Sequence, residues 1–207
     1  MAELKVSLTQ EERTGAARRS LVDATIDVLA NEGYRGVTFA RVGEVAGISR
    51  GLIGYHFGTK RALIETVISS IRDNYWQQAV SRAAESREVS GLDALRKMVA
   101  TYLDRLSRDP RPAKVMLVLG TESMNEHPSI RAAVRDAYAD QRRELQAFID
   151  VGQKDGSIRA GVDAVGFAGM FEAVIRGIVL QYLVDPKGFD LAATKAAAEA
   201  TVSMLAA

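Results

Sequence analysis

The sequence contains no cysteine and only two histidines, His56 and His127. The absence of cysteine excludes disulfide bonds, thiolate catalysis and cysteine-ligated metal sites. The two histidines lie far apart in the sequence, and the chain has neither a glycine-rich phosphate-binding loop nor a convincing nucleophile motif. We therefore expect a protein that is not an enzyme and that needs no metal and no cofactor.

Long uninterrupted apolar segments are also missing. A membrane-spanning helix needs roughly 18 predominantly apolar residues, whereas the most apolar zones here, Val115–Leu119 and Ala173–Val184, are short or interrupted by charge, as at Arg176. The segment from Met1 to Arg13 is polar and lacks the apolar stretch of a secretory signal. We expect a cytoplasmic protein with no membrane partner.

The composition is that of an ordinary globular protein. Its 207 residues are 47% hydrophobic and 26% charged, which suffices for one large core or two modest ones. The net charge is only +1, but between Gly33 and Arg61 basic residues far outnumber the single acid, Glu44. A local excess of positive charge favours an anionic partner for this segment; a chance excess on a solvated helix face is the alternative.

Apolar residues recur at helical spacing along almost the whole chain, with no alternating strand pattern, internal repeat or low-complexity linker. Thr9 to Glu12 has the pattern of a capping box, and the apolar stripe from Leu63 to Tyr75 predicts a helix that continues past Val80. We predict an all-α protein of about nine helices. Its N-terminal domain is expected at residues 1–58, and its helical C-terminal domain at 59–207.

Two short helices joined by a tight turn are expected at Phe39–Ala46 and Arg50–Phe57. Gly47 allows the turn, while Thr38 and Ser49 occupy the positions that cap the two helices. This pair of helices within a basic segment fits a DNA-binding helix-turn-helix.

The second of these helices has two distinct faces. Ile53 and Phe57 are four residues apart and would attach it to the core, whereas Gly51, Leu52 and Tyr55 project to the opposite side. Arg50 begins the helix, which is the part of a recognition helix that reaches base edges.

The run from Val37 to Lys60 resembles the TetR/AcrR family of repressors. The turn Ala46-Gly47-Ile48-Ser49 and the ending Tyr55-His56-Phe57, followed by Lys60, carry the resemblance, which covers roughly Thr9 to Ile68. The C-terminal part is similar only in helix count and layout, and its last two helices look most like the betaine-responsive branch.

The resemblance implies roles for individual residues on DNA. Those matching phosphate-binding positions are Thr38, Tyr55, His56 and Lys60; those matching positions that face bases are Arg50, Gly51 and Leu52. An arginine can bond guanine O6 and N7, and a leucine can pack on a thymine methyl. For His56 a buried structural role remains the alternative.

Two glycines depart from the family pattern. Gly54 stands where an aromatic residue is usual, and Gly43 replaces a common alanine. A glycine inside a helix costs on the order of 1 kcal/mol relative to alanine. We therefore expect a recognition helix that is more flexible in the free protein and is ordered by DNA.

A sensor also needs a cavity, and the C-terminal part contains apolar and aromatic residues that suit one. The candidates are Met98, Tyr102, Leu106, Met116, Leu119, Met124, Tyr138, Phe148 and Phe171. Polar residues that could orient a ligand are Glu122, Asn125, His127, Glu172 and Arg176. Each apolar candidate can equally be ordinary core, and His127 before Pro128 can equally be a helix cap.

The segment following Asp163 is apolar on more than one side and is predicted to form a dimer interface. Its candidate interface residues are Phe167, Met170, Val174, Ile178 and Tyr182. Gly166, Gly169 and Gly177 would permit close approach of a second copy in a four-helix bundle, as the family resemblance implies. A fully intramolecular core is the alternative.

These expectations combine into a homodimeric repressor that binds a palindromic operator in double-stranded DNA. An unidentified small-molecule effector would release it by favouring a second conformation. The alternative is a DNA-binding dimer of the same fold that has no small-molecule effector.

Overall fold

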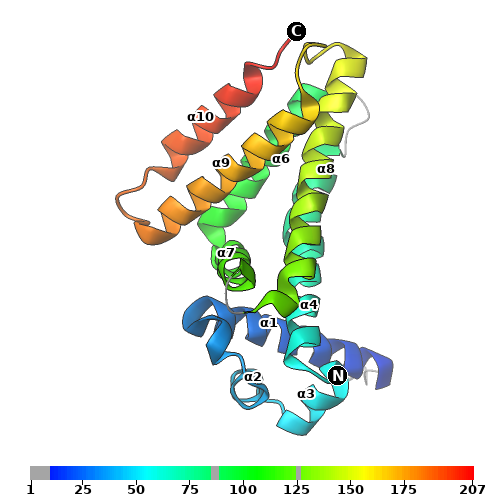
Figure 1. The fold of residues 1–207 in the computed structure, drawn as a ribbon, viewed down its shortest axis with the longest axis vertical. Coiled ribbons are helices and arrows are strands. Elements are labelled where there is room, and N and C mark those ends of the chain that lie inside the picture. The colour runs from blue at the N-terminus through cyan, green and yellow to red at the C-terminus, as the bar shows by residue number, and fades with distance from the viewer. Residues whose placement is uncertain (1–9, 85–88, 125–126) are drawn as a thin grey trace, which may run out of the picture. The chain divides into compact units, whose positions relative to one another are not determined.

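A computed structural model describes residues 10–84, 89–124 and 127–207; Thr9 of the predicted capping box lies outside them. The described residues form helices and no regular strand, apart from an isolated antiparallel bridge between Ile158 and Ala206. The helices are α1 (Gln10–Gly36), α2 (Phe39–Ala46), α3 (Arg50–Phe57), α4 (Lys60–Ile71), α5 (Gln77–Ala84), α6 (Gly91–Arg108), α7 (Arg111–Met124), α8 (Arg131–Asp155), α9 (Ala164–Val184) and α10 (Leu191–Ser203) (Figure 1).

A π-helical turn, Arg72–Trp76, joins α4 to α5 without a break, so the described residues form nine separate α-helical segments. The prediction of an all-α fold with about nine helices is confirmed. The helix that begins at Lys60 does continue past Val80, but the sequence pattern did not predict its π turn. A short 3-10 turn, Pro128–Ile130, precedes α8.

The chain forms two compact units, Met1–Val67 and Ile68–Ala207. The division lies inside α4, C-terminal to the boundary at 58/59 expected from the sequence. Leu63, Ile64 and Val67 are fully buried, so the first turns of α4 contribute apolar side chains to a core. The N-terminal unit is built from α1, α2, α3 and these turns of α4. Gly33, with a φ of 71°, interrupts the helical geometry near the end of α1.

In the C-terminal unit, α6 packs against both α8 and α10, and α9 packs against α7 and α8 (Figure 1). The start of α6 lies very close to the end of α8. The Gly91 amide donates to the Asp155 carboxylate at 2.7 Å, and a Cβ at Gly91 would lie 2.5 Å from Cα of Gly152. Glycine at position 91 therefore permits the two helix backbones to approach each other.

Within the described ranges, α9 is long and apolar enough to cross a membrane, with a mean hydropathy of 1.5 over 18 residues. This property was not expected from the sequence, because Glu172 and Arg176 interrupt the apolar run of α9. Length and composition are weak evidence, since a core helix of a soluble protein has the same properties. The Glu172–Arg176 ion pair and the packing of α9 on α7 and α8 favour a packed helix.

Candidate functional site

The N-terminal unit contains the predicted pair of short helices, α2 and α3. The Thr38 hydroxyl accepts the Arg41 amide at 3.1 Å and caps α2, while the Ser49 hydroxyl accepts the Leu52 amide at 3.4 Å and caps α3. Gly47 between them has a φ of 65°, which favours glycine. Side-chain caps and one glycine thus produce the tight turn predicted from the sequence.

One face of α3 is anchored and the other is open. Ile53 is fully buried and Phe57 nearly so, whereas Arg50 and Gly51 are exposed and Tyr55 is 81% exposed. An exposed tyrosine on a short helix places an aromatic ring and a hydroxyl donor in solvent, which suits a phosphate contact. The buried face and the exposed face of α3 are therefore the two faces predicted from the sequence.

The basic side chains around this face differ in availability. Arg41 is bound to Glu32 and Glu44, which raise the pKa of its guanidinium, and Arg61 is paired with Glu65 at 2.7 Å. Arg50, in contrast, has no ion-pair partner among the described residues. The positive charge counted in the sequence is therefore partly neutralised, and Arg50 at the start of α3 is an available guanidinium.

Lys60 occupies a more structural position than the family resemblance implies. Its ammonium donates to the Tyr34 carbonyl at 2.6 Å and lies 4.0 Å from the centroid of the Tyr34 ring. These contacts tie the start of α4 to the segment that follows the Gly33 kink. Leu52 is 39% exposed, and His56 is half-buried between Tyr55 and Phe57, with ring centroids 5.5 and 6.1 Å away.

The two unusual glycines have different environments. Nothing lies within 4 Å of a Cβ added at Gly54, but a Cβ at Gly43 would lie 2.5 Å from the Ile48 carbonyl oxygen. Gly43 is therefore required for the turn to pack on α2 in this chain. Both glycines were predicted to lower the stability of their helices. In the structure this prediction holds only for Gly54, where a side chain would meet no neighbour.

Alanine substitutions at these two positions are expected to have opposite effects. Gly54→Ala should stabilise α3 by about 0.5–1 kcal/mol through helix propensity, while Gly43→Ala should destabilise the turn by about 1 kcal/mol because the clash outweighs that gain. Amide hydrogen exchange in α2 and α3 measures both. Faster exchange in Gly54→Ala would contradict the assignment of Gly54 as the flexible point of the recognition helix.

A small cavity of about 30 Å³ lies in the C-terminal unit, among α6, α7, α8, α9 and the π turn. Its polar walls are Gln141, Glu172 and Arg176. The aromatic and apolar residues that line it are Ile71, Tyr75, Trp76, Tyr102, Pro112, Ala113, Met116, Leu117, Ile175 and Val179. This is room for about two water molecules, so a ligand would have to displace part of the wall.

The structure brings together only some of the predicted pocket residues. Tyr102 and Met116 line the cavity, as do the polar candidates Glu172 and Arg176. The predicted residues buried elsewhere in the core are Met98, Leu106, Leu119, Phe148 and Phe171. Met124 is 64% exposed and lies outside the cavity, and Asn125 falls outside the described residues.

The other two polar candidates are Glu122 and His127, and His127 directly precedes the 3-10 turn. Its side chain makes no capping hydrogen bond there, and its Nε2 lies 3.8 Å from the Glu122 carboxylate. Neither residue lines the cavity.

Tyr75 and Trp76 were not among the residues predicted to line a pocket, although Tyr75 belongs to the apolar stripe that begins at Leu63. Both are buried and come from the π turn, a local change of register that frequently marks functional sites. Tyr102 makes edge-to-face contacts with both rings, and the Trp76 indole donates to Glu144 of α8. The single tryptophan of the chain is the strongest signal that the sequence offered.

Three tyrosines lie in or beside the cavity: Tyr75 and Tyr102 line it, and Tyr138 contacts its wall residue Arg176. Their hydroxyl groups remain neutral. Burial raises the pKa of Tyr102 to about 12 and also raises the pKa values of Tyr75 and Tyr138 above their ordinary value. The Tyr138 hydroxyl donates to the Met116 carbonyl at 3.0 Å, whereas the buried Tyr75 hydroxyl has no hydrogen-bond partner among the described residues. A buried hydroxyl without a partner is costly, so a ligand atom there would be stabilising.

The outer half of α9 is apolar and exposed. Met170 and Val174 are 49% and 44% exposed, and a Cβ added at Gly169 or Gly177 would meet nothing within 4 Å. Of the predicted interface residues, Met170 and Val174 therefore lie on the open surface, while Ile178 is buried within the chain. Phe167 is half-buried and stacks on Phe171 at 5.5 Å.

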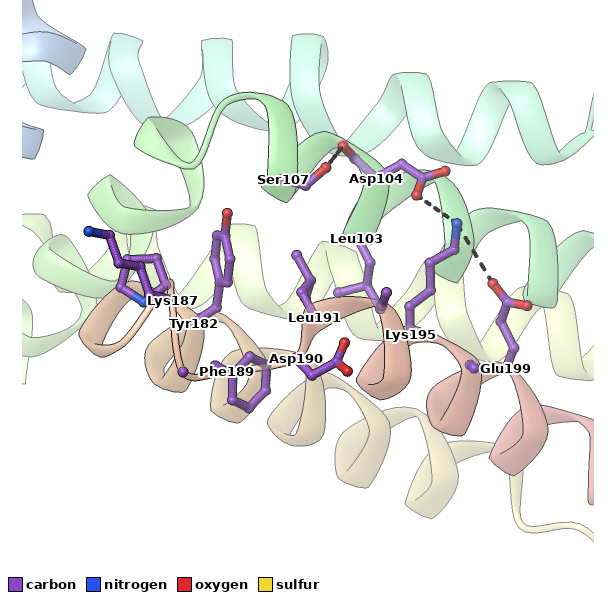
Figure 2. A pocket seen from close by; sticks show the side chains of 14 residues that line it. Leu103, Asp104, Ser107, Tyr182, Lys187, Phe189, Asp190, Leu191, Lys195 and Glu199 are labelled. Carbon is purple, nitrogen blue, oxygen red and sulfur yellow. Dashed lines mark hydrogen bonds and ion pairs between the residues drawn. The ribbon is translucent and has the colours of Figure 1, made fainter.

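An open groove of about 900 Å³ lies between α6, the segment that joins α9 to α10, and α10. Figure 2 shows the Lys195 ammonium between Asp104 of α6, at 2.6 Å, and Glu199 of α10, at 4.0 Å. Tyr182, predicted at the dimer interface, lines this groove. Because the Lys195 charge is already balanced by two carboxylates, we interpret it as a link between α6 and α10.

Both units match models of known protein families. Residues 21–67 match the model of bacterial regulatory proteins of the tetR family, and residues 91–207 match that of the BetI-type transcriptional repressor, C-terminal. The transcriptional regulator BetI of Paraburkholderia phytofirmans is 30% identical over 181 residues, which cover 87% of each chain.

Two solved structures illustrate the fold. A protein from Saccharomonospora viridis in complex with choline has a TM-score of 0.77 at 23% identity and covers 91% of this chain and 96% of its own. FadR of Bacillus subtilis in complex with stearoyl-CoA has a TM-score of 0.77 at 17% identity, with coverages of 89% and 97%. The matched family models and the 30% identity to BetI show that this chain belongs to the TetR family of DNA-binding transcription regulators, with a C-terminal domain of the BetI type.

Proposed function

We propose that this protein is a homodimeric cytoplasmic repressor that binds a palindromic operator through α3 and leaves it when a small molecule enters the cavity beside Tyr102. The exposed face of α3 carries the proposal: Arg50 has no ion-pair partner among the described residues and Tyr55 is 81% exposed, above the fully buried Ile53. A two-fold dimer would place two such helices in successive major grooves, roughly 34 Å apart.

Within this proposal the residues divide into two groups. Arg50, Gly51 and Leu52 face bases, while the groups of Thr38, Ser49, Tyr55, His56 and Lys60 lie where phosphates can be bound. Thr38 and Ser49 already cap helices, and Lys60 already binds Tyr34. We therefore assign the larger share of phosphate binding to Tyr55 and the helix N-termini.

Selection of the purified protein against random duplex DNA, followed by titration of the best site over a range of salt, tests the operator. We expect a palindrome bound with nanomolar affinity. Failure of every selected sequence to exceed random DNA would refute the proposal.

The two groups predict different mutant behaviour. Arg50→Ala should lose about 1–3 kcal/mol on the selected site and relax specificity at one base pair, while Tyr55→Phe should weaken all duplexes alike, by about 1 kcal/mol. Arg135→Ala, which removes an exposed arginine from the C-terminal unit, is the charge control. Uniform losses from both Arg50→Ala and Tyr55→Phe would contradict the division.

Several features support an effector at the cavity. Aromatic walls, the mostly buried Glu172–Arg176 ion pair and the unpartnered Tyr75 hydroxyl are typical of ligand sites, and proteins of this fold have been solved with choline and with stearoyl-CoA. Tyr75 and Trp76 lie on the helical segment that continues α4, whose first turns belong to the N-terminal unit. A change in the π turn can therefore be passed along one continuous helix, and a coupling of about 1–3 kcal/mol would be typical.

The size of the cavity favours a second candidate, a DNA-binding dimer without an effector. About 30 Å³ is too little for a metabolite. This candidate predicts that no small molecule weakens operator binding, whereas the effector hypothesis requires a wall residue that can move.

A further inference from the structure

The π turn at Arg72–Trp76 has no evident cause in its own sequence. Such turns are rare and occur mostly as single turns inside α-helices. Residues 60–84 contain neither glycine nor proline, the two residues least favourable to a helix. The Gln77 amide nevertheless donates to the Arg72 carbonyl, five residues earlier. The cause of the turn therefore lies in the helices packed around it.

Helix α8 holds the end of the turn through Glu144. The Trp76 indole and the Gln77 side-chain amide donate to the two oxygens of this carboxylate. Burial raises the pKa of the Glu144 carboxyl and the two donors oppose that rise, so the charged carboxylate depends on them. One turn earlier on α8, the Asp140 carboxylate accepts the Arg72 guanidinium at 3.2 Å. Both ends of the π turn are thus attached to α8.

Helix α6 holds the middle of the turn through Arg105. One Nη of its guanidinium donates to the main-chain carbonyl of Asn74 at 2.7 Å, and the other donates to the Gln78 side chain at 3.0 Å. The guanidinium carbon lies 4.9 Å from the centroid of the Tyr75 ring. In a regular α-helix each interior carbonyl points along the axis to the amide four residues later. The bond from Arg105 to the Asn74 carbonyl therefore depends on the register of the helix.

The turn connects these two residues, which we call the clamp, to the cavity. Tyr75 and Trp76 line the cavity, whereas the clamp residues Arg105 and Glu144 do not. Because only about 30 Å³ is free, an occupant has to displace wall side chains. Displacement of either ring breaks a contact with the clamp, since the Tyr75 ring lies against Arg105 and the Trp76 indole donates to Glu144. Loss of the clamp favours the regular α-helical form, with which the sequence of the turn is compatible.

Resting on the proposed function, we propose that the π turn is a register switch, which Arg105 and Glu144 hold in its π form and which an occupant of the cavity releases to a regular α-helix. The π turn accommodates one residue more than an α-helical turn. One residue of an α-helix corresponds to ~1.5 Å of rise and ~100° of rotation. The release therefore rotates the residues before the turn against the residues after it. Operator binding weakens, because the two recognition helices of a dimer must match the spacing of successive major grooves.

The hydrogen-bond acceptor of the Gln77 amide reports the register directly. NMR couplings across the hydrogen bond identify this acceptor in the protein without DNA. In the wild type we expect coupling to the Arg72 carbonyl, and in Arg105→Met combined with Glu144→Leu we expect coupling to the Asp73 carbonyl, four residues before the amide. Retention of the Arg72 coupling in a double variant with the wild-type circular dichroism spectrum would overturn the proposal.

Arg96→Met combined with Glu144→Gln is the matched control. Arg96 is an exposed arginine of the same helix α6, and glutamine retains an oxygen that can accept the indole proton. This control should keep the Arg72 coupling, and a shift to Asp73 in it would contradict the assignment of the register to the clamp contacts. Should the first double variant fold poorly, its two single variants are read in the same way. The Arg72 coupling alone in both of them would overturn the proposal.

Deletion of Asn74 separates a switch from a general loss of stability. Asn74 is exposed, and without it a regular α-helical turn spans the same segment, so the residues on either side keep their orientation. Arg105→Met combined with Glu144→Leu should weaken operator binding at least ten-fold in the full chain, but less than two-fold when Asn74 is also deleted. Equal losses in both backgrounds would show that the clamp does not act through the register.

The two readouts distinguish this inference from the proposed function. A protein that selects no operator but changes the acceptor of its Gln77 amide refutes the proposed function alone. A protein that binds a palindrome but keeps the Arg72 coupling in every variant overturns the register switch alone.

Discussion

Replacing Gly91 with alanine is expected to destabilise the C-terminal unit by about 3 kcal/mol, at the upper end of the usual cost of overpacking. The new Cβ would lie 2.5 Å from Cα of Gly152 and 2.8 Å from the Phe148 carbonyl oxygen. These atoms are backbone, so no side-chain rotation relieves the clash and α6 must move away from α8. The melting temperature should fall by roughly 6–12 °C.

Gly161→Ala is the matched control, because nothing lies within 4 Å of a Cβ built there. It should stay within about 0.5 kcal/mol of the wild type. Similar melting temperatures for Gly91→Ala and Gly161→Ala would show that the close approach of α6 and α8 is not a constraint.

Val174→Asp is expected to convert the proposed dimer into monomers and to weaken operator binding at least 100-fold. Val174 is 44% exposed on the apolar outer half of α9, and in the proposed four-helix bundle this face is buried against its mate. A carboxylate in such an interface is desolvated without a partner, which is costly. Each recognition helix would then bind its half-site alone and lose the gain from two linked contacts.

Val151→Asp provides the comparison, since Val151 of α8 is 50% exposed and lies outside the proposed interface. It should remain dimeric in sedimentation and bind the operator as the wild type does. If Val174→Asp remained dimeric while Val151→Asp became monomeric, the dimer interface would have to be assigned to α8 instead of α9.

The helix-turn-helix was the part of the molecule best predicted from sequence. Thr38, Ser49 and Gly47 determine where α2 and α3 begin and how the chain turns between them, and all act within a few residues. The burial of Ile53 and Phe57 followed from their spacing alone. The absence of an ion-pair partner for Arg50 among the described residues could not be predicted in this way, because it depends on which acids pair with Arg41 and Arg61.

The C-terminal unit was predicted less well. Helical spacing identified α9 as apolar on several sides but did not show which half faces inward, so Ile178 was assigned to the surface that Met170 and Val174 occupy. The π turn escaped prediction because one extra residue in a helix leaves no signature in a period of 3.6 residues. Because the π turn was not predicted, the position of Trp76 in the cavity wall could not be predicted either.

The sequence by itself determined the helices, their caps and the membership of its N-terminal segment in a recognisable family, because these depend on interactions between residues near in the chain. Only the tertiary structure decided that Gly43 and Gly91 are required for close approach, that Lys60 binds Tyr34, and that Arg176 lies between Glu172 and Tyr138. Each of these depends on atoms brought together by packing. No local pattern encodes the distances between them.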